Sequence, residues 1–210
     1  MKEGKIKIAD YLSELKSEAS TPGGGAVSAL TLAQGIALVM MVANLTIGKE
    51  KYKTFEKINR EVLDYGEVLV ARAMELVDED IKAFNIVSDA YKLPKESDEE
   101  KAIRSKKIRE ASVFATEVPL EVMKVAFEGL RLTTNLMGKS NINVISDLGA
   151  AATNLEAAIK ASWLNVVINL PSIKNPEKEA EFREKGENYL KEGEAISRKI
   201  YEQVIETLES

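Results

Sequence analysis

Residues 19–48, ASTPGGGAVSALTLAQGIALVMMVANLTIG, contain no charged side chain. The part that follows the glycines, 26–47, is long enough to cross a lipid bilayer as a helix. It also carries hydroxyl and amide side chains, and no other part of the chain has a comparable apolar run. We therefore interpret it as a helix of a soluble protein that is buried on all sides in a bundle or a subunit interface, with a membrane-spanning helix as the less favoured alternative.

Apolar residues at helical spacing predict further helices on both sides of this segment, and prolines separate most of them. No stretch alternates apolar and polar residues for long enough to indicate a sheet. The expected helices cover 8–16, 51–92, 97–137, 144–170 and the chain after 176. Pro119 is expected to kink or split the third of these. The sequence therefore predicts an all-α fold: one domain over residues 1–210, a bundle of five to seven helices with long antiparallel helices.

The composition restricts the chemistry. The 210 residues include 29 Lys and Arg, 34 Asp and Glu, no His and no Cys. Disulfides, thiolate nucleophiles, Ser-His-Asp triads and most transition-metal sites are excluded. Proton transfer must come from Asp, Glu, Lys, Tyr or water. The net charge of −5 and the lack of a basic segment do not favour a nucleic acid partner. The charged amino terminus is unlike a signal peptide, so a cytoplasmic location is expected.

Asp80 is a carboxylate on an otherwise apolar stripe. It shares a helix face with Ala73, Val77 and Phe84. Burial on that face would raise its pKa into the range that suits general acid–base catalysis. The alternative is a carboxylate at the edge of the stripe that reaches water or pairs with a lysine such as Lys82.

Two polar groups lie near or on the helix expected at 144–170. The segment 139–149 gathers amides, hydroxyls and Asp147, which could accept hydrogen bonds from a ligand or could cap the helix, as Ser146 also could. Asn165 and Asn169 lie one turn apart on an apolar helix. Buried amides need partners, which could be backbone groups or a ligand.

The segment Pro22-Gly23-Gly24-Gly25 precedes the uncharged helix. Free N–H groups at a helix start favour an anion, although the Gly-Lys-Ser/Thr of a nucleotide-binding loop is missing. The glycines could instead serve a tight turn and close packing. Asn44 and Lys49 place an amide and a cation near the other end of this helix.

Several strings occur together in one order along the chain. Residues 20–29, STPGGGAVSA, are followed by 41–49, MVANLTIGK. Supporting strings are DIKAF at 80–84, LPK at 93–95, NINVISDLG at 141–149 and NVVINL at 165–170. This sequence resembles the cyclodeaminase domain of formiminotransferase-cyclodeaminase, whose bacterial stand-alone relatives include methenyltetrahydrofolate cyclohydrolases. Ala26 stands where Ser is common, and Ser140 where Gly is common.

The resemblance implies an all-helical domain that forms a homodimer and acts on a tetrahydrofolate carrying a one-carbon unit. It places the catalytic carboxylate at Asp80 and implies no metal and no prosthetic group. The substrate-binding residues that we predict from it are Pro22, Gly23, Gly24, Gly25, Asn44, Lys49, Asn143, Asp147 and Asn165. Asp147 or an asparagine would hold the pterin, and Lys49 with the glycines would meet the glutamate tail.

The chemistry suits a protein without histidine. In cyclodeamination, N10 attacks the formimino carbon on N5 and ammonia leaves, so one carboxyl can take up a proton and return it. Formiminotetrahydrofolate cyclodeaminase is the expected activity, and methenyltetrahydrofolate cyclohydrolase in the same pocket is the alternative. A second alternative is a helical interaction module without activity, in which Asp80 is inert.

Overall fold

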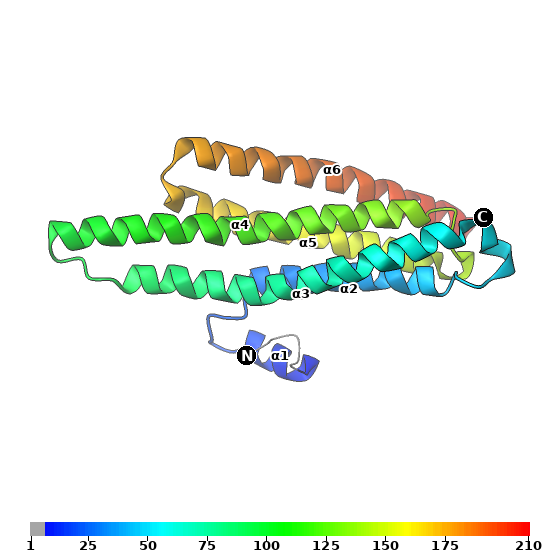
Figure 1. Cartoon of the computed structure of the whole chain (residues 1–210), viewed down its shortest axis with the longest axis horizontal. Helices are drawn as coiled ribbons and strands as arrows, with labels where there is room; N and C mark the ends of the chain where they lie inside the picture. Colours follow the sequence, from blue (N-terminus) through cyan, green and yellow to red (C-terminus); the bar gives the residue numbers. More distant parts are fainter. Residues whose placement is uncertain (1–6) are drawn as a thin grey trace.

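The structure is a computed structural model that describes residues 7–210, and every regular element in that part of the chain is a helix (Figure 1). This confirms the all-α prediction. The α-helices are α1 (Ile8–Leu15), α2 (Gly24–Asn44), α3 (Glu56–Lys92), α4 (Asp98–Leu136), α5 (Ile145–Ile173) and α6 (Pro176–Glu209). Two 3₁₀ helices, η2 (Glu50–Phe55) and η3 (Ile142–Val144), lie in the connections.

Helix α2 occupies the centre of the bundle because its residues are uncharged around the whole circumference. It packs against α3, α4 and α5, and Leu32, Ile36 and Val39 are fully buried. Among residues 7–210 it is the one helix whose length and hydropathy would suit a membrane span. A single chain does not bury this helix on all sides, because Met41 near its carboxyl end and Leu45 just after it remain 37% and 42% exposed. Burial in the bundle is therefore partial, and the predicted burial in a subunit interface stays a prediction.

The long helices run past two of the prolines that we expected to interrupt or end them. Helix α4 continues through Pro119, and α5 continues through Pro171 to Ile173. The expected split of α4 is therefore wrong. The start of α4 agrees with the sequence, since Ser97 and Glu100 form a reciprocal capping box.

The connection between α4 and α5 is tied to the carboxyl end of α2. The backbone N–H of Asn141 donates to Thr46 Oγ1 (2.8 Å), and its side-chain amide donates to the Leu45 carbonyl (3.2 Å). The residue before α5 is Val144, so neither Ser146 nor Asp147 caps this helix, and that alternative is excluded.

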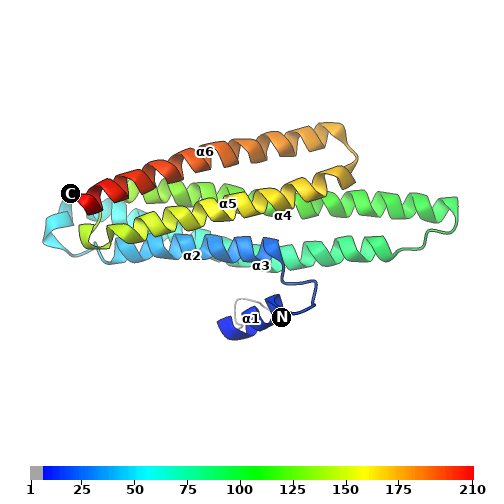
Figure 2. The same ribbon diagram turned by 180° about the vertical axis from the view of Figure 1, so that it is seen from behind.

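Helix α1 stands apart from the bundle in both views (Figures 1 and 2). Residues 16–23 connect it to α2, and the Thr21–Pro22 peptide within them is cis. The chain therefore enters the bundle at Gly24, part-way along α3, where α3 and α4 extend beyond the start of α2 (Figure 1).

Candidate active site

Asp80 projects from α3 onto the amino end of α2. A Cβ built on Gly25 would lie 1.9 Å from Asp80 Oδ1, so only glycine allows this approach. The backbone N–H of Ala26 donates a hydrogen bond to the carboxylate. No residue of α2 itself caps this end by a side chain, so Asp80 supplies from another helix the negative charge that a helix start favours.

The surroundings of Asp80 raise the pKa of its carboxyl. Burial raises the pKa of Asp80, and the Ala26 N–H lowers it by a smaller amount. No lysine or arginine within the described residues forms an ion pair with it, so the pairing with Lys82 that we considered is not observed. Raised pKa values of this origin suit a group that gains and loses a proton during catalysis.

A cavity of about 370 Å³ opens beside Asp80, a volume within the range of small-molecule sites. Gly23, Gly24 and Gly25 line it together with Asp80 and Asn165, whose amide lies next to Gly24, so the structure brings together five of the predicted residues. Residues that we had not assigned to a site also line it: Ser20, Thr21, Ala83, Phe84, Val87, Ala115, Ile168 and Asn169. In residues 7–210, no group of three Asp or Glu side chains is arranged to bind a metal ion.

The two asparagines of α5 use their amide nitrogens within the protein. Asn165 Nδ2 donates to the Ala161 carbonyl (2.9 Å), and Asn169 Nδ2 donates to the carbonyls of Asn165 (2.9 Å) and Ala115 (2.8 Å). Backbone partners therefore satisfy these donors, as one of our two alternatives expected. The oxygen atoms of both amides accept no hydrogen bond from the described residues.

Residues 7–188 match the formiminotransferase-cyclodeaminase family. The chain belongs to this family. It is 41% identical over 201 residues to a methenyltetrahydrofolate cyclohydrolase of Methylorubrum extorquens, a match that covers 96% of this chain and 97% of the relative. It is 30% identical to the formimidoyltransferase-cyclodeaminase of Sus scrofa, covering 88% of this chain and 34% of that protein.

A solved family member has the same fold. The crystal structure of a formiminotetrahydrofolate cyclodeaminase from Thermotoga maritima superposes with a TM-score of 0.81 at 29% identity, covering 98% of this chain and 97% of the other. The resemblance expected from the sequence is thus confirmed over almost the whole chain.

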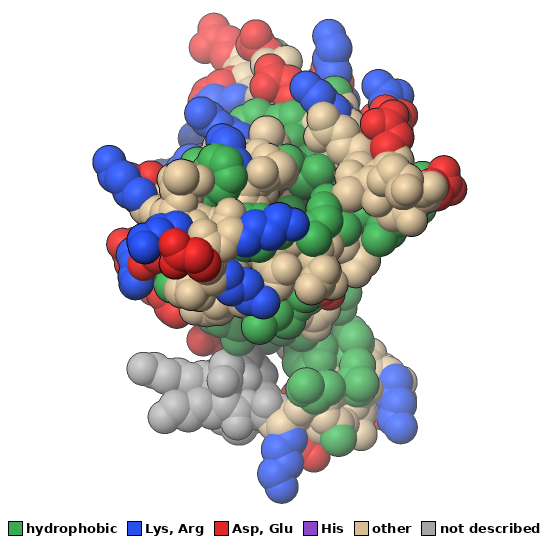
Figure 3. Space-filling view, turned by 90° about the vertical axis from the view of Figure 1, so that its right-hand side faces the viewer, with side chains coloured by type: hydrophobic (Ala, Val, Ile, Leu, Met, Phe, Trp, Pro, Cys, Tyr) green, Lys and Arg blue, Asp and Glu red, His purple; other side chains and the backbone are tan. Residues whose placement is uncertain are grey.

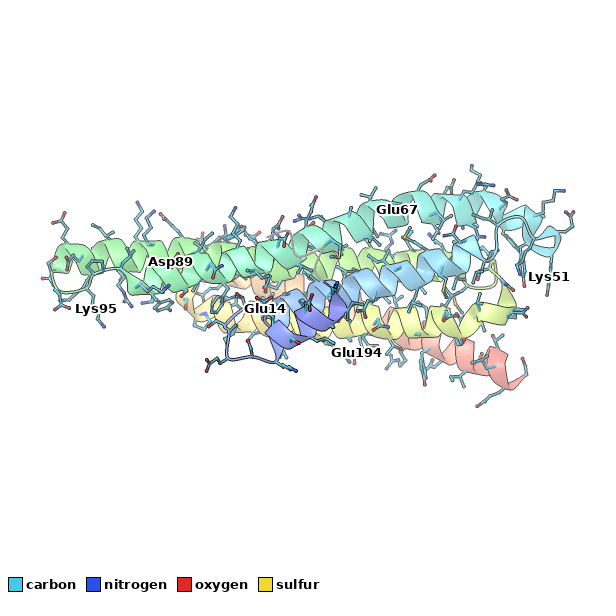
Figure 4. The ribbon with its side chains drawn as sticks, turned by 90° about the horizontal axis from the view of Figure 1, so that it is seen from below. Glu14, Lys51, Glu67, Asp89, Lys95 and Glu194 are labelled. Atoms are coloured by element: carbon cyan, nitrogen blue, oxygen red, sulfur yellow. The ribbon has the colours of Figure 1, made fainter. Side chains whose placement is uncertain are left out.

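Four of the substrate-binding residues that we predicted for this chain do not line the cavity beside Asp80. They are Asn44, Lys49, Asn143 and Asp147. They lie at the carboxyl end of α2 or in the segment joined to it, and a straight helix of 21 residues spans about 30 Å. Lys51 and Lys95, labelled in Figure 4, mark the two opposite ends of the bundle. Within one chain, these four residues therefore do not line the same cavity as Asp80, and their role in substrate binding stays a prediction.

The end of the molecule that carries the α2–α3 connection is rich in lysine and arginine side chains (Figure 3). Lys49 contributes one of these exposed charges. Pro22, also predicted to bind substrate, is buried next to Gly23 and does not line the cavity.

Sequence reasoning did not assign the apolar residues at the rim of the cavity to the site. Phe84 and Ile168 are 44% and 74% exposed at that rim. The spacing of four residues between Asn165 and Asn169 had indicated a shared helix face, and both asparagines line the cavity.

Proposed function

We propose that this chain is a folate-dependent one-carbon enzyme that hydrolyses 5,10-methenyltetrahydrofolate, with Asp80 as the proton carrier. The observation that carries the proposal is the partly buried carboxyl of Asp80 at the wall of the cavity, held by the Ala26 N–H without a cationic partner among the described residues. The match to the Methylorubrum cyclohydrolase, which spans nearly the whole of both chains, favours hydrolysis over the cyclodeamination that the sequence had placed first.

In the hydrolytic reaction, water adds to the methenyl carbon that joins N5 and N10 of the folate. The Asp80 carboxylate accepts a proton from this water as the C–O bond forms. The resulting carboxylic acid protonates N5 as the bond from N5 to this carbon breaks, which gives 10-formyltetrahydrofolate and leaves one proton for solvent. Such acid–base catalysis contributes on the order of 10²–10⁴-fold in rate.

Cyclodeamination in the same cavity is the second candidate function, and the superposition on the Thermotoga cyclodeaminase favours it. There N10 replaces water as the nucleophile and ammonia is the leaving group. Both reactions pass through a tetrahedral carbon between N5 and N10. One carboxyl that alternates between base and acid therefore serves either reaction.

The assay follows loss of 5,10-methenyltetrahydrofolate and, separately, ammonia release from formiminotetrahydrofolate. We expect Asp80→Asn to lose at least 10²-fold in kcat on the accepted substrate. Asp64→Asn, an exposed carboxylate on the same helix, is the matched control and should keep full activity. Turnover of neither substrate by the folded wild-type chain, with no thermal stabilisation by folinic acid, would support the interaction module instead.

We also propose that the chain forms a homodimer through the open face of α2, defined by Gln34, Ala37, Met41 and Leu45. This face bears no charge, and a groove beside it is lined by Met40 and Val70 among others. An uncovered apolar face of this kind favours association. If the two α2 helices are antiparallel, the Lys49 end of one copy lies near the Asp80 cavity of the other.

Mixed dimers test this arrangement. One copy carries Asp80→Asn and the other Lys49→Ala, with different affinity tags for purification. If each site takes Asp80 from one copy and Lys49 from the other, both substitutions fall in the same site of a mixed dimer and the second site is intact. Mixed dimers should then show about half of the wild-type kcat, whereas each homodimer is impaired in both sites. Mixed dimers no more active than the mean of the two homodimers would exclude a shared site.

A further inference from the structure

Pro119 leaves one carbonyl of α4 without its helical partner. In an α-helix the carbonyl of residue 115 accepts the N–H of residue 119, and proline has no N–H. Ala115 is 9% exposed, so water does not readily replace this partner. Asn169, 54 residues further along the chain, donates its Nδ2 to this carbonyl at 2.8 Å.

This contact fixes the orientation of the Asn169 amide. Its two N–H groups reach two carbonyl oxygens, those of Ala115 and Asn165. Rotating the amide by 180° would place Oδ1 against both carbonyl oxygens, so that orientation is unfavourable. Oδ1 accepts no hydrogen bond from residues 7–210, and Asn169 lines the cavity beside Asp80. Asn169 therefore offers the cavity an acceptor and no donor.

The other asparagines of α5 lack this constraint. Asn165 and Asn154 each donate to the carbonyl four residues earlier, and neither Nδ2 has a second acceptor within the described residues. Each keeps an N–H that is free to turn toward a ligand. The fixed amide is specific to Asn169 because only its side chain lies within reach of the carbonyl that Pro119 leaves free.

We propose that Asn169 is a specificity-determining residue whose Oδ1 accepts a hydrogen bond from an N–H group of the pterin ring, and that Pro119 is a positioning residue that acts through the Ala115 carbonyl. The inference rests on the proposed function for its ligand, a tetrahydrofolate. A fixed acceptor at Asn169 selects a heterocycle that presents an N–H donor to it, because an analogue without that donor leaves the acceptor unpaired.

The test compares kcat, KM and the Kd for folinic acid across a set of variants. Asn169→Ala should raise KM and Kd by about 10–100-fold and change kcat by less than about fivefold, the result expected for loss of one ligand hydrogen bond. Asn154→Ala, which removes the same type of backbone bond far from the cavity, should leave all three unchanged.

Pro119 variants separate positioning from folding. Pro119→Ala supplies an N–H at position 119 that competes for the Ala115 carbonyl, so KM should rise by about two- to tenfold without a fall in Tm. The double variant Pro119→Ala/Asn169→Ala restores a partner to that carbonyl. It should recover any stability that Asn169→Ala loses while retaining the full defect in KM and Kd.

Wild-type KM and Kd in a folded Asn169→Ala protein would overturn the inference, as would recovery of both in the double variant. If the wild-type chain binds folinic acid but turns over neither substrate, the proposed function fails, and the Kd ratios still decide the role of Asn169. Absence of any folinic acid binding to the wild type would overturn both.

Discussion

Gly25 is the position at which one methyl group should disable the site. Its Cβ would lie 1.9 Å from Asp80 Oδ1 and 2.4 Å from Asp80 Cγ, whereas ordinary contacts begin near 3.4 Å. In Gly25→Ala the Asp80 carboxylate or the start of α2 must therefore move by about 1.5 Å. Displacement of a catalytic group by about 1 Å can cost about 10²-fold in rate, and we expect a loss of this size in kcat.

The effect on stability combines two opposing contributions. Alanine is favoured over glycine within a helix by about 0.5–1 kcal/mol. Overpacking a buried contact costs about 1–3 kcal/mol. We expect a net loss of about 0.5–2 kcal/mol in the free energy of unfolding of Gly25→Ala, measured by urea denaturation. Gly24→Ala is the matched stability control, because its Cβ would meet nothing closer than the Asn165 amide at 3.8 Å.

A double-mutant cycle tests whether contact with Asp80 causes the destabilisation of Gly25→Ala. In an Asp80→Ala background the atoms that obstruct the new methyl are gone, so Gly25→Ala should no longer destabilise. The coupling energy should be about 1–3 kcal/mol, with the double variant more stable than the two single losses predict. Gly25→Ala with wild-type stability and kcat, or additive losses in the cycle, would refute the reasoning.

Three further predictions concern the charge of Asp80, the open face of α2 and the α4–α5 connection. Burial raises the pKa of folded Asp80 above the ordinary value of 3.8. The stabilisation from the protonated Asp80 carboxyl is therefore complete below pH 3.8 and is lost as the pH rises through the pKa of the folded state. The Asp80→Asn variant does not titrate at this position, so its free energy of unfolding should rise relative to that of the wild type from pH 3.8 toward neutral pH. A difference in urea midpoint that does not vary with pH would contradict this. Met41→Glu should convert the dimer to a monomer, as measured by light scattering, whereas Lys199→Glu at an exposed position of α6 should leave the dimer intact. Equal molecular masses for the two variants would argue against the α2 interface. Thr46→Val removes the oxygen that accepts the buried Asn141 N–H and should cost about 1–3 kcal/mol in unfolding free energy, whereas Thr46→Ser should cost less. Equal losses of unfolding free energy in the two variants would mean that the Thr46 hydroxyl does not stabilise this connection.

The helical periodicity located most of the fold. The uncharged run around Leu32 and Ile36 identified the central helix, because in a soluble bundle a helix without a charged face is covered by other helices over most of its surface. The capping box at Ser97 likewise depends on residues three apart in sequence and was readable in advance. Pro119 was misjudged, because the partner that keeps its helix satisfied, Asn169, comes from another helix.

In the candidate site, too, local sequence patterns identified single residues, whereas the contacts between them depend on helix packing. The helix stripe identified Asp80, and the glycines identified the start of α2, but their contact depends on how α3 crosses α2. The same packing separated Lys49 and Asp147 from that cavity, because 21 residues of straight helix lie between the two ends of α2.

The sequence by itself determined which segments form helices, which helix is central and which carboxylate lies on an apolar stripe, since periodicity, capping and charge act over a few residues. Only the tertiary structure decided which polar groups meet. The contacts of Asp80 with Gly25 and of Asn169 with Ala115 join residues that are 54 or 55 positions apart. Contacts at that separation depend on helix crossing and packing, which no local pattern specifies.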